Sequence, residues 1–174
     1  SEAYQKLNPQ SLLPTLEDDG NYFTQSLAIL EYIEEAYPDP PLLPTLPTQR
    51  ARVRSIALAV ACDIHPINNL RVLKYLSQEL KLDQVQKTTW YRHWISAGLG
   101  AIETMLTQHS ETGEFCHGSS VSLADICLVP QVFNANRFDC DMSAYPTIMR
   151  INDACLSMKE FQQAMPENQP DAEE

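Results

Sequence analysis

The densest group of side chains able to do chemistry lies in the run from Asp63 to Arg71, around a single proline. Pro66 has no backbone N–H, so it interrupts the helix that the surrounding apolar spacing predicts. In an α-helix, His65 and Asn69 share one face, and Arg71 lies roughly 120° around the axis from His65. A histidine, amides and an arginine at a kink suit a polar ligand. A lone helical histidine is more often structural, so both interpretations stay open.

A second group lies where a predicted hairpin meets a helix. Pro14 stands in the first strand of that hairpin and cannot donate to its ladder. A cis peptide bond there would turn the N–H and C=O of Leu13 outward for an extended peptide ligand, but a trans proline is commoner and the residues alone favour it. Gln25 and Ser26 start a helix straight after a strand. Their free N–H groups predict a carboxylate site or a plain N-cap, with the N-cap favoured.

Two further motifs belong to the second half of the chain. Arg137 follows a predicted helix and suits a carboxylate, although an exposed salt bridge is the favoured interpretation from residues alone. Ser122 and Asp125 form a capping box, with Asp in place of the usual Glu or Gln, and Val121 can pack on Ile126. This box predicts a helix start and carries no catalytic role.

The elements that must position these residues follow from apolar spacing and from Gly and Pro. A β-hairpin is predicted over residues 12–23 with a turn over 17–20, followed by a helix that Thr24 or Ser26 caps and that has Glu34 on its polar face. Residues 38–47 hold five of the twelve prolines and predict a stiff linker. Beyond it no strand is expected. The predicted helical segments run from a cap at Thr48 to 64, over 70–76, over 82–106 with Trp90 and Trp94 in its buried stripe, from Ser122, from Pro146 and over 160–165.

Composition excludes several classes of function. The 174 residues carry a formal net charge of −11, which repels polyanions, so no nucleic-acid partner is expected. No apolar run reaches about 18 residues, so no membrane helix is expected, and the first residues show no signal peptide. The five cysteines are odd in number and lack CxxC spacing. They are interpreted as small core residues in a reducing cytoplasm rather than as metal ligands or disulfides.

Four segments together resemble one family, the zeta class of glutathione transferases, which includes the maleyl isomerases. These segments are Asn8–Leu16, Gln25–Tyr32, Cys62–Asn69 and Leu123–Val132, and the resemblance extends from Asn8 to Asp171. It implies an α+β fold, in which the C-terminal half of a thioredoxin-like domain precedes an all-α helical bundle. The expected domains are a partial glutathione-binding domain over 1–40, a linker over 41–47, the helical domain over 48–166, and an acidic, disordered tail over 167–174.

The resemblance also implies an activity and roles for particular residues. Glutathione is the expected cofactor, and the reaction is cis–trans isomerisation of a maleyl dicarboxylate of aromatic catabolism, maleylpyruvate or maleylacetoacetate. Thiolate addition to the double bond, rotation and elimination would give the fumaryl product. A cytoplasmic homodimer is expected. By this resemblance, Leu13 precedes a cis Pro14 and pairs with the cysteinyl part of glutathione, and Gln25 and Ser26 hold its γ-glutamyl carboxylate. His65 and Asn69 lie beside both glutathione and substrate. Arg71 and Arg137 bind the dicarboxylate.

One departure from the family pattern concerns the thiol. Family members begin with a β-α-β segment that carries a Ser-Ser or Ser-Cys motif and an arginine, and nothing in this chain matches it. The predicted hairpin would also leave a strand edge unpaired. The chain is therefore expected to begin inside its first domain and to hold no catalytic residue of its own. Two alternatives remain: a truncated relative that only binds, and a general transferase or dehalogenase of the same class.

Overall fold

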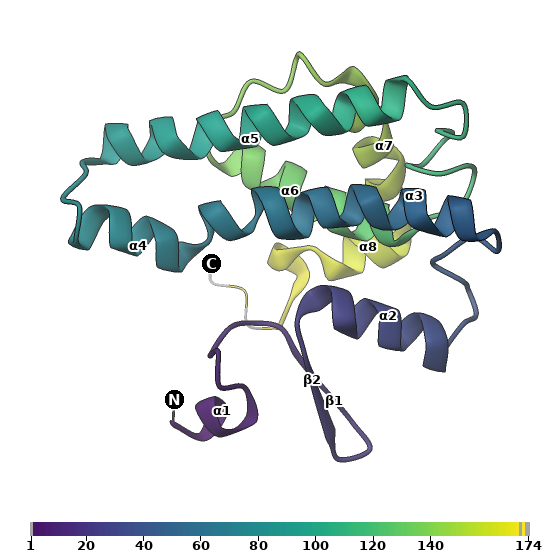
Figure 1. Cartoon of the computed structure of the whole chain (residues 1–174), viewed down its shortest axis with the longest axis horizontal. Coiled ribbons are helices and arrows are strands. Elements are labelled where there is room, and N and C mark those ends of the chain that lie inside the picture. The colour runs from purple at the N-terminus through teal and green to yellow at the C-terminus, as the bar shows by residue number, and fades with distance from the viewer. Residues whose placement is uncertain (1, 171, 173–174) are drawn as a thin grey trace. The chain divides into compact units, whose positions relative to one another are not determined.

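The computed structural model describes residues 2–170 and 172. Their contacts divide them into two compact units, with the boundary between Leu43 and Pro44 (Figure 1). Each unit is described by itself.

The first unit contains one hairpin and two helices. Its elements are α1 (Glu2–Leu7), β1 (Thr15–Asp18), β2 (Asn21–Thr24) and α2 (Ser26–Ala36). The strands are antiparallel, with Thr15 opposite Thr24 and Asp18 opposite Asn21. Asp19 and Gly20 connect them with φ angles of 49° and 75°. Positive φ at both residues is typical of the tight hairpin turn whose twist matches the strands, so the predicted turn over 17–20 was too wide. Helix α1 was not predicted.

Helix α2 differs from its predicted form at both its start and its polar face. Gln25 is the N-cap, and no side chain caps the helix, so the predicted cap at Thr24 or Ser26 was wrong. Glu34 is only 7% exposed, and its carboxylate accepts a hydrogen bond from the backbone N–H of Leu42 at 2.6 Å. This bond satisfies a carboxylate that the sequence placed on the polar face, and it ties the start of the proline-rich segment to the helix.

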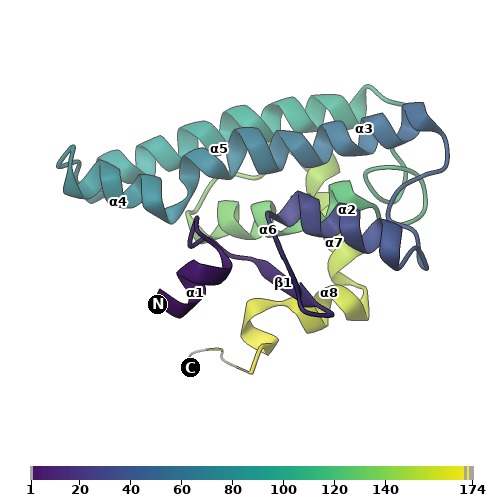
Figure 2. The ribbon, with the colours of Figure 1, turned by 60° about the horizontal axis from the view of Figure 1, so that its bottom comes forward.

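The second unit is a helical bundle, and within its described residues no strand occurs, as predicted. Its elements are α3 (Pro47–Leu58), the π-helical turn η1 (Ala59–Ile64), the 3-10 turn η2 (Pro66–Asn68), α4 (Leu70–Gln78), α5 (Gln84–Thr107), α6 (Leu123–Arg137), α7 (Pro146–Leu156), α8 (Lys159–Ala164) and the 3-10 turn η3 (Pro166–Asn168). Figures 1 and 2 show α3 and α4 as one interrupted line that runs alongside α5.

Helix starts in this unit follow local chemistry. Pro47 occupies the first position of α3 with Leu46 as N-cap, so the predicted cap at Thr48 was wrong; the fixed φ of proline suits that first position. The capping box of α6 is confirmed. Asp125 is fully buried, and its carboxylate accepts hydrogen bonds from the Ser122 N–H at 2.8 Å and the Ser122 hydroxyl at 2.7 Å. It also accepts one from the Cys116 N–H at 2.8 Å, which anchors the preceding loop.

The core of the bundle is built on α5. This helix buries Tyr91, Ile95, Leu99, Ile102 and Leu106. Trp90 is only half-buried and Trp94 is 37% exposed, so placing both in the buried stripe was wrong. The stripe lies one position further along the helix, because Tyr91 and Ile95 share the face of Leu99 and Ile102.

The C-terminal segment is partly ordered. Residues 166–168 form η3, and the Asn168 side-chain amide donates to the Gln162 carbonyl at 2.6 Å. The prediction of a disordered tail is therefore wrong for its first residues. The rest of that prediction falls partly on residues 171, 173 and 174, which lie outside the described residues.

Candidate functional site

Two of the predicted site motifs meet at one end of the hairpin. Because Thr15 pairs with Thr24, Pro14 precedes one strand where Gln25 follows the other, and the two residues leave the hairpin side by side. The Leu13–Pro14 bond is cis. The residue-based preference for a trans bond was thus wrong, and the cis bond that the family resemblance implied is confirmed.

Leu13 presents its backbone to solvent. It is 84% exposed, and in the described part of the chain neither its N–H nor its C=O has a hydrogen-bond partner. The preceding residue is held firmly: the Leu12 carbonyl accepts from the Tyr4 hydroxyl at 2.5 Å and from the Asn8 side-chain amide at 2.7 Å. Asn8 is 2% exposed. Sequence reasoning assigned no role to Tyr4 or Asn8, because their burial and their bonds to Leu12 are set by the folded structure.

The start of α2 is shaped to receive an anion. Gln25 has φ 72° and ψ 118°, a conformation that is costly for a residue with a side chain and that clusters at ligand sites. Its side-chain amide donates to the Gln10 side-chain oxygen at 2.5 Å. In the described structure the N–H groups of Ser26 and Leu27 have no acceptor, as expected for a first helical turn. Such groups bind carboxylates, and the helix dipole adds positive potential there.

The kink in the second unit places three predicted residues. The helix widens in η1, where the His65 N–H bonds to the Val60 carbonyl five residues back at 2.9 Å. Asn69 then leaves helical geometry with φ −62° and ψ 149°, and its side-chain oxygen accepts from the Arg71 N–H at 3.1 Å. Asn69 is thus the N-cap of α4. His65 and Asn69 do not share a face of one continuous helix, so that expectation was wrong: Pro66 breaks the periodicity on which it relied.

The charges at the kink differ in kind. His65 is exposed, but partial burial lowers the pKa of its imidazole below the ordinary value, so the neutral form predominates at pH 7 and acts as a hydrogen-bonding group. Arg71 is exposed and retains its cation. The kink therefore offers one fixed positive charge beside neutral polar groups.

Arg137 is the last residue of α6 and is exposed. Among the described residues it takes part in no ion pair, which leaves the guanidinium available to a ligand. Its charge acts on Tyr91: burial raises the pKa of Tyr91 to about 12, and Arg137 opposes that rise. The Tyr91 ring stacks on Phe138, with centroids 3.6 Å apart and an interplanar angle of 11°. Arg137 thus lies close to Tyr91, in the first half of α5.

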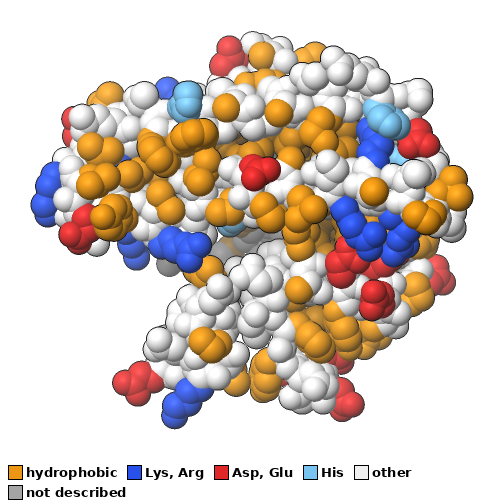
Figure 3. All heavy atoms as spheres, viewed as in Figure 1, with side chains coloured by type: hydrophobic (Ala, Val, Ile, Leu, Met, Phe, Trp, Pro, Cys, Tyr) orange, Lys and Arg blue, Asp and Glu red, His pale blue; other side chains and the backbone are white. Residues whose placement is uncertain are grey.

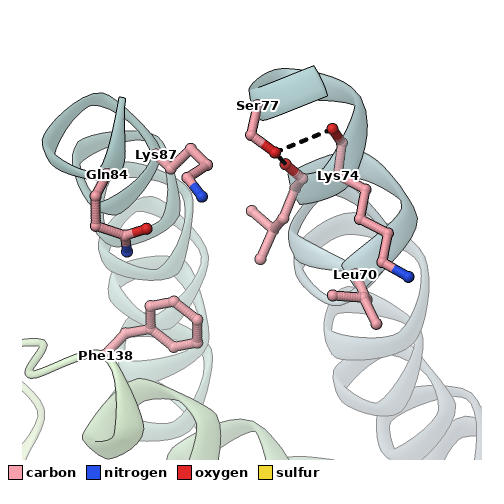
Figure 4. A pocket seen from close by; sticks show the side chains of 7 residues that line it. Leu70, Lys74, Ser77, Gln84, Lys87 and Phe138 are labelled. Carbon is pink, nitrogen blue, oxygen red and sulfur yellow. Dashed lines mark hydrogen bonds between the residues drawn. The ribbon is translucent and has the colours of Figure 1, made fainter. Parts of the chain in front are cut away.

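A hollow of about 240 Å³ separates α4 from the start of α5. Figure 4 shows the Phe138 ring and the Lys87 ammonium group between the two helices. Its lining residues are Leu70, Leu73, Lys74, Ser77, Gln84, Lys87 and Phe138. Leu70 adjoins Arg71 and Phe138 adjoins Arg137, so the hollow lies beside the backbone of both predicted arginines.

Three of the five cysteines are unsuited to act as a catalytic thiol. All five are free, and burial raises the pKa of Cys116, of Cys155 to about 12 and of Cys127 to about 11, so these three are protonated at neutral pH. Within residues 2–170 and 172, no three His, Cys, Asp or Glu side chains are placed to share a metal ion. In the same residues no helix is long and apolar enough to cross a membrane.

Comparisons with known proteins agree with this geometry. Residues 1–41 match the family model for the glutathione S-transferase N-terminal domain. A probable maleylacetoacetate isomerase of Vibrio cholerae is 50% identical over 97% of this chain and 78% of its own length. The solved holo structure of a bacterial zeta-class maleylpyruvate isomerase is 43% identical and covers 99% of this chain and 82% of its own, with a TM-score of 0.97.

A maleylacetoacetate isomerase from Methylobacterium extorquens, solved with bound malonate and glutathione, is 40% identical and covers 100% of this chain and 82% of its own, with a TM-score of 0.96. These likenesses span both units and confirm the predicted fold, a thioredoxin-like portion followed by an all-helical domain. The chain belongs to the zeta-class glutathione transferases, the family of the maleylacetoacetate and maleylpyruvate isomerases.

Proposed function

We propose that this protein binds glutathione and catalyses the glutathione-dependent cis–trans isomerisation of a maleyl dicarboxylate, maleylpyruvate or maleylacetoacetate. One observation carries the proposal: the outward-turned backbone of Leu13 and the unpaired N–H groups at the start of α2 lie at the same end of the hairpin. A γ-glutamyl peptide carries the groups complementary to both features, an extended amide and a carboxylate.

The first unit fits glutathione group by group. The Leu13 N–H and C=O would pair with the cysteinyl amide as an added strand. The N–H groups of Ser26 and Leu27, with the Ser26 hydroxyl, would hold the γ-glutamyl carboxylate, and Gln25 would orient it. Bound glutathione supplies the thiol nucleophile for the reaction.

The second unit fits a dicarboxylate with a developing negative charge. Arg71 and Arg137 would each bind a carboxylate, for which the planar guanidinium fork is suited. Neutral His65 and the Asn69 amide would hydrogen-bond the polarised carbonyl, where charge accumulates during isomerisation. With a net charge of −11 the chain as a whole repels dianions, so these local cations are needed for substrate binding.

An arginine substitution in the full-length gene product tests the substrate side. Arg137→Lys keeps the charge but loses the planar fork, and we expect its KM for the maleyl substrate to rise about tenfold, which corresponds to about 1.4 kcal/mol. Arg150→Lys is the matched control, because Arg150 is also exposed in the helical unit and donates only to the Glu114 carbonyl at 3.1 Å. Equal KM values for the two variants would remove Arg137 from the site. Binding of glutathione without turnover of either maleyl substrate would favour a binding protein instead.

Three coarser features complete the proposal. The glutathione-binding portion would occupy residues 1–40, the linker 41–47, the helical domain 48–166 and the tail 167–174. The protein would be a homodimer, and the hydrophobic side chains visible on one face of the helical unit support this (Figure 3). Leu58 of that unit is 44% exposed. A reducing cytoplasm suits its five free cysteines. Light scattering of the purified protein at two concentrations tests the dimer.

A further inference from the structure

We infer that one turn of α5, Trp90–Arg92, is the positioning element for the substrate side. It holds both the kink over residues 65–71 and the end of α6 that carries Arg137. The inference rests on the proposed function, because it explains how the side chains assigned there are placed. None of the three residues needs to touch substrate.

The first arm of this element reaches the kink. The Trp90 indole N–H donates to the Ile67 carbonyl at 3.1 Å. The Asn68 side-chain amide donates to the Tyr91 carbonyl over a longer 3.4 Å, and Asn68 is only 7% exposed. Ile67 and Asn68 stand between Pro66 and Asn69, where the main chain is a single 3-10 turn. Helical geometry ends after this turn, because Asn69 has φ −62° and ψ 149°, so bonds from a neighbouring helix help to fix the place of the turn.

The packing of α4 makes this arm more important. A hollow of about 240 Å³ lies between α4 and the start of α5, so the packing between these two helices is incomplete (Figure 4). The far end of α4 is held by buried Leu76 and by the turn in which the Leu82 N–H bonds to the Leu76 carbonyl at 3.0 Å. At its near end the bonds from Trp90 and Asn68 hold the turn that leads into Arg71.

The second arm reaches the end of α6. Tyr91 stacks on Phe138, and the Arg92 Nε–H donates to the Phe138 carbonyl at 2.7 Å. Two neighbouring residues of α5 thus hold the ring and the carbonyl of Phe138, which directly follows Arg137. The ion pair between Arg92 and Asp139, at 3.6 Å, involves largely exposed side chains and adds little.

These two arms have one consequence for binding. A dicarboxylate needs its two cations at a fixed separation, and a displacement of one ångström can cost a large factor in rate. Here consecutive residues of a single long helix fix both attachment points, so Arg71 and Arg137 share one rigid reference.

Steady-state kinetics of the full-length gene product tests the inference. Trp90→Phe keeps an aromatic ring but removes the donor to Ile67, and Arg92→Met removes the donor to Phe138. Trp94→Phe is the control for losing an indole, since within the described residues the Trp94 indole N–H has no hydrogen-bond partner, and its ring lies edge-on to Trp90 and His93. Arg150→Met is the control for losing an exposed charge. We expect Trp90→Phe and Arg92→Met each to raise the KM for the maleyl substrate about tenfold. Arg92→Met should leave the KM for glutathione unchanged, whereas Trp90→Phe should raise it by a smaller factor, because His65 and Asn69 are expected beside both ligands. Both controls stay at wild-type values.

Hydrogen exchange supplies a readout that needs no activity. Backbone amides over residues 64–72 should exchange faster in Trp90→Phe, and those over 134–140 faster in Arg92→Met, with neither change in the controls. Wild-type exchange and wild-type KM in both variants would overturn the inference, and so would equal changes in both KM values. If the two variants exchange as expected but the wild-type protein shows no glutathione-dependent isomerisation, the proposed function is refuted and the positioning role stands.

Discussion

The carboxylate of Asp125 should be among the most costly side chains to alter, because it is fully buried and accepts three hydrogen bonds. Asp125→Asn conserves its shape but replaces one acceptor oxygen with a donor. One of the two N–H groups that it serves, from Cys116 and Ser122, is then left unsatisfied, and the remaining hydrogen bonds lose the carboxylate's charge. An unsatisfied buried donor costs about 1–3 kcal/mol and the lost charge-assisted bond about 1 more, so we expect a loss of about 3 kcal/mol.

Urea and thermal unfolding followed by far-ultraviolet circular dichroism measure this loss. For a chain of this size, a loss of 3 kcal/mol corresponds to a fall in Tm of about 6–12 °C. Ser122→Ala, which removes the hydroxyl's bond to Asp125 and its part in the capping box, should cost about 1 kcal/mol and serves as the graded control. If Asp125→Asn unfolds within about 0.5 kcal/mol of the wild type, Asp125 does not anchor the loop and helix as described.

Two further predictions concern the kink. An alanine Cβ at position 98 would lie 2.3 Å from Ile64 Cγ1, so Gly98→Ala should destabilise the protein by about 1–3 kcal/mol in urea unfolding. At position 100 the nearest atom to such a Cβ is 4.0 Å away, so Gly100→Ala should be neutral or stabilise by up to about 1 kcal/mol. The reverse order would contradict the packing of α5 against η1. His65 has a folded-state pKa below its unfolded value of about 6.5, so its contribution to stability is present above that pH and is lost as pH falls towards the folded pKa. An NMR titration midpoint for His65 at or above about 6.5 would contradict its desolvation.

Local sequence signals were sufficient to predict an element's start or end where a single residue, such as a capping serine or a proline, determines the local backbone conformation. The Ser122–Asp125 box marked the start of α6, and Pro38 marked the end of α2. The hairpin was also predictable, although Asp19-Gly20 was not recognised as the complete turn. In each of these cases the determining interactions lie within a few residues of one another, so the sequence contains them directly.

Other features depend on contacts that sequence spacing does not reveal. The sequence pattern placed Glu34 on a polar helix face. In the structure Glu34 is buried, and its carboxylate accepts a hydrogen bond from the Leu42 N–H. His65 and Asn69 seemed to share a helical face, but the helix widens and breaks before Asn69. The strained backbone of Gln25 has no local signature, because it is maintained by the surrounding fold rather than by its own propensity.

The site residues were proposed from motif resemblance more than from physics. Residues alone favoured a trans Pro14 and a plain N-cap for the helix that Gln25 and Ser26 begin, with Thr24 or Ser26 as the cap. The structure shows a cis bond, and Gln25 is an N-cap without a side-chain bond. Tyr4, Asn8, Trp90 and Arg92 act through hydrogen bonds to backbone carbonyls elsewhere in the chain. Such bonds are set by tertiary structure and lie beyond periodicity arguments.

The most direct test of the proposed function is to follow the olefinic protons of maleylpyruvate and of maleylacetoacetate by NMR after adding the full-length gene product, with and without glutathione. The coupling between these protons distinguishes the cis substrate from the trans product. We expect enzyme-dependent conversion of at least one substrate to the trans isomer only when glutathione is present. Conversion at the same rate without glutathione, or no conversion of either substrate with it, would contradict the proposal.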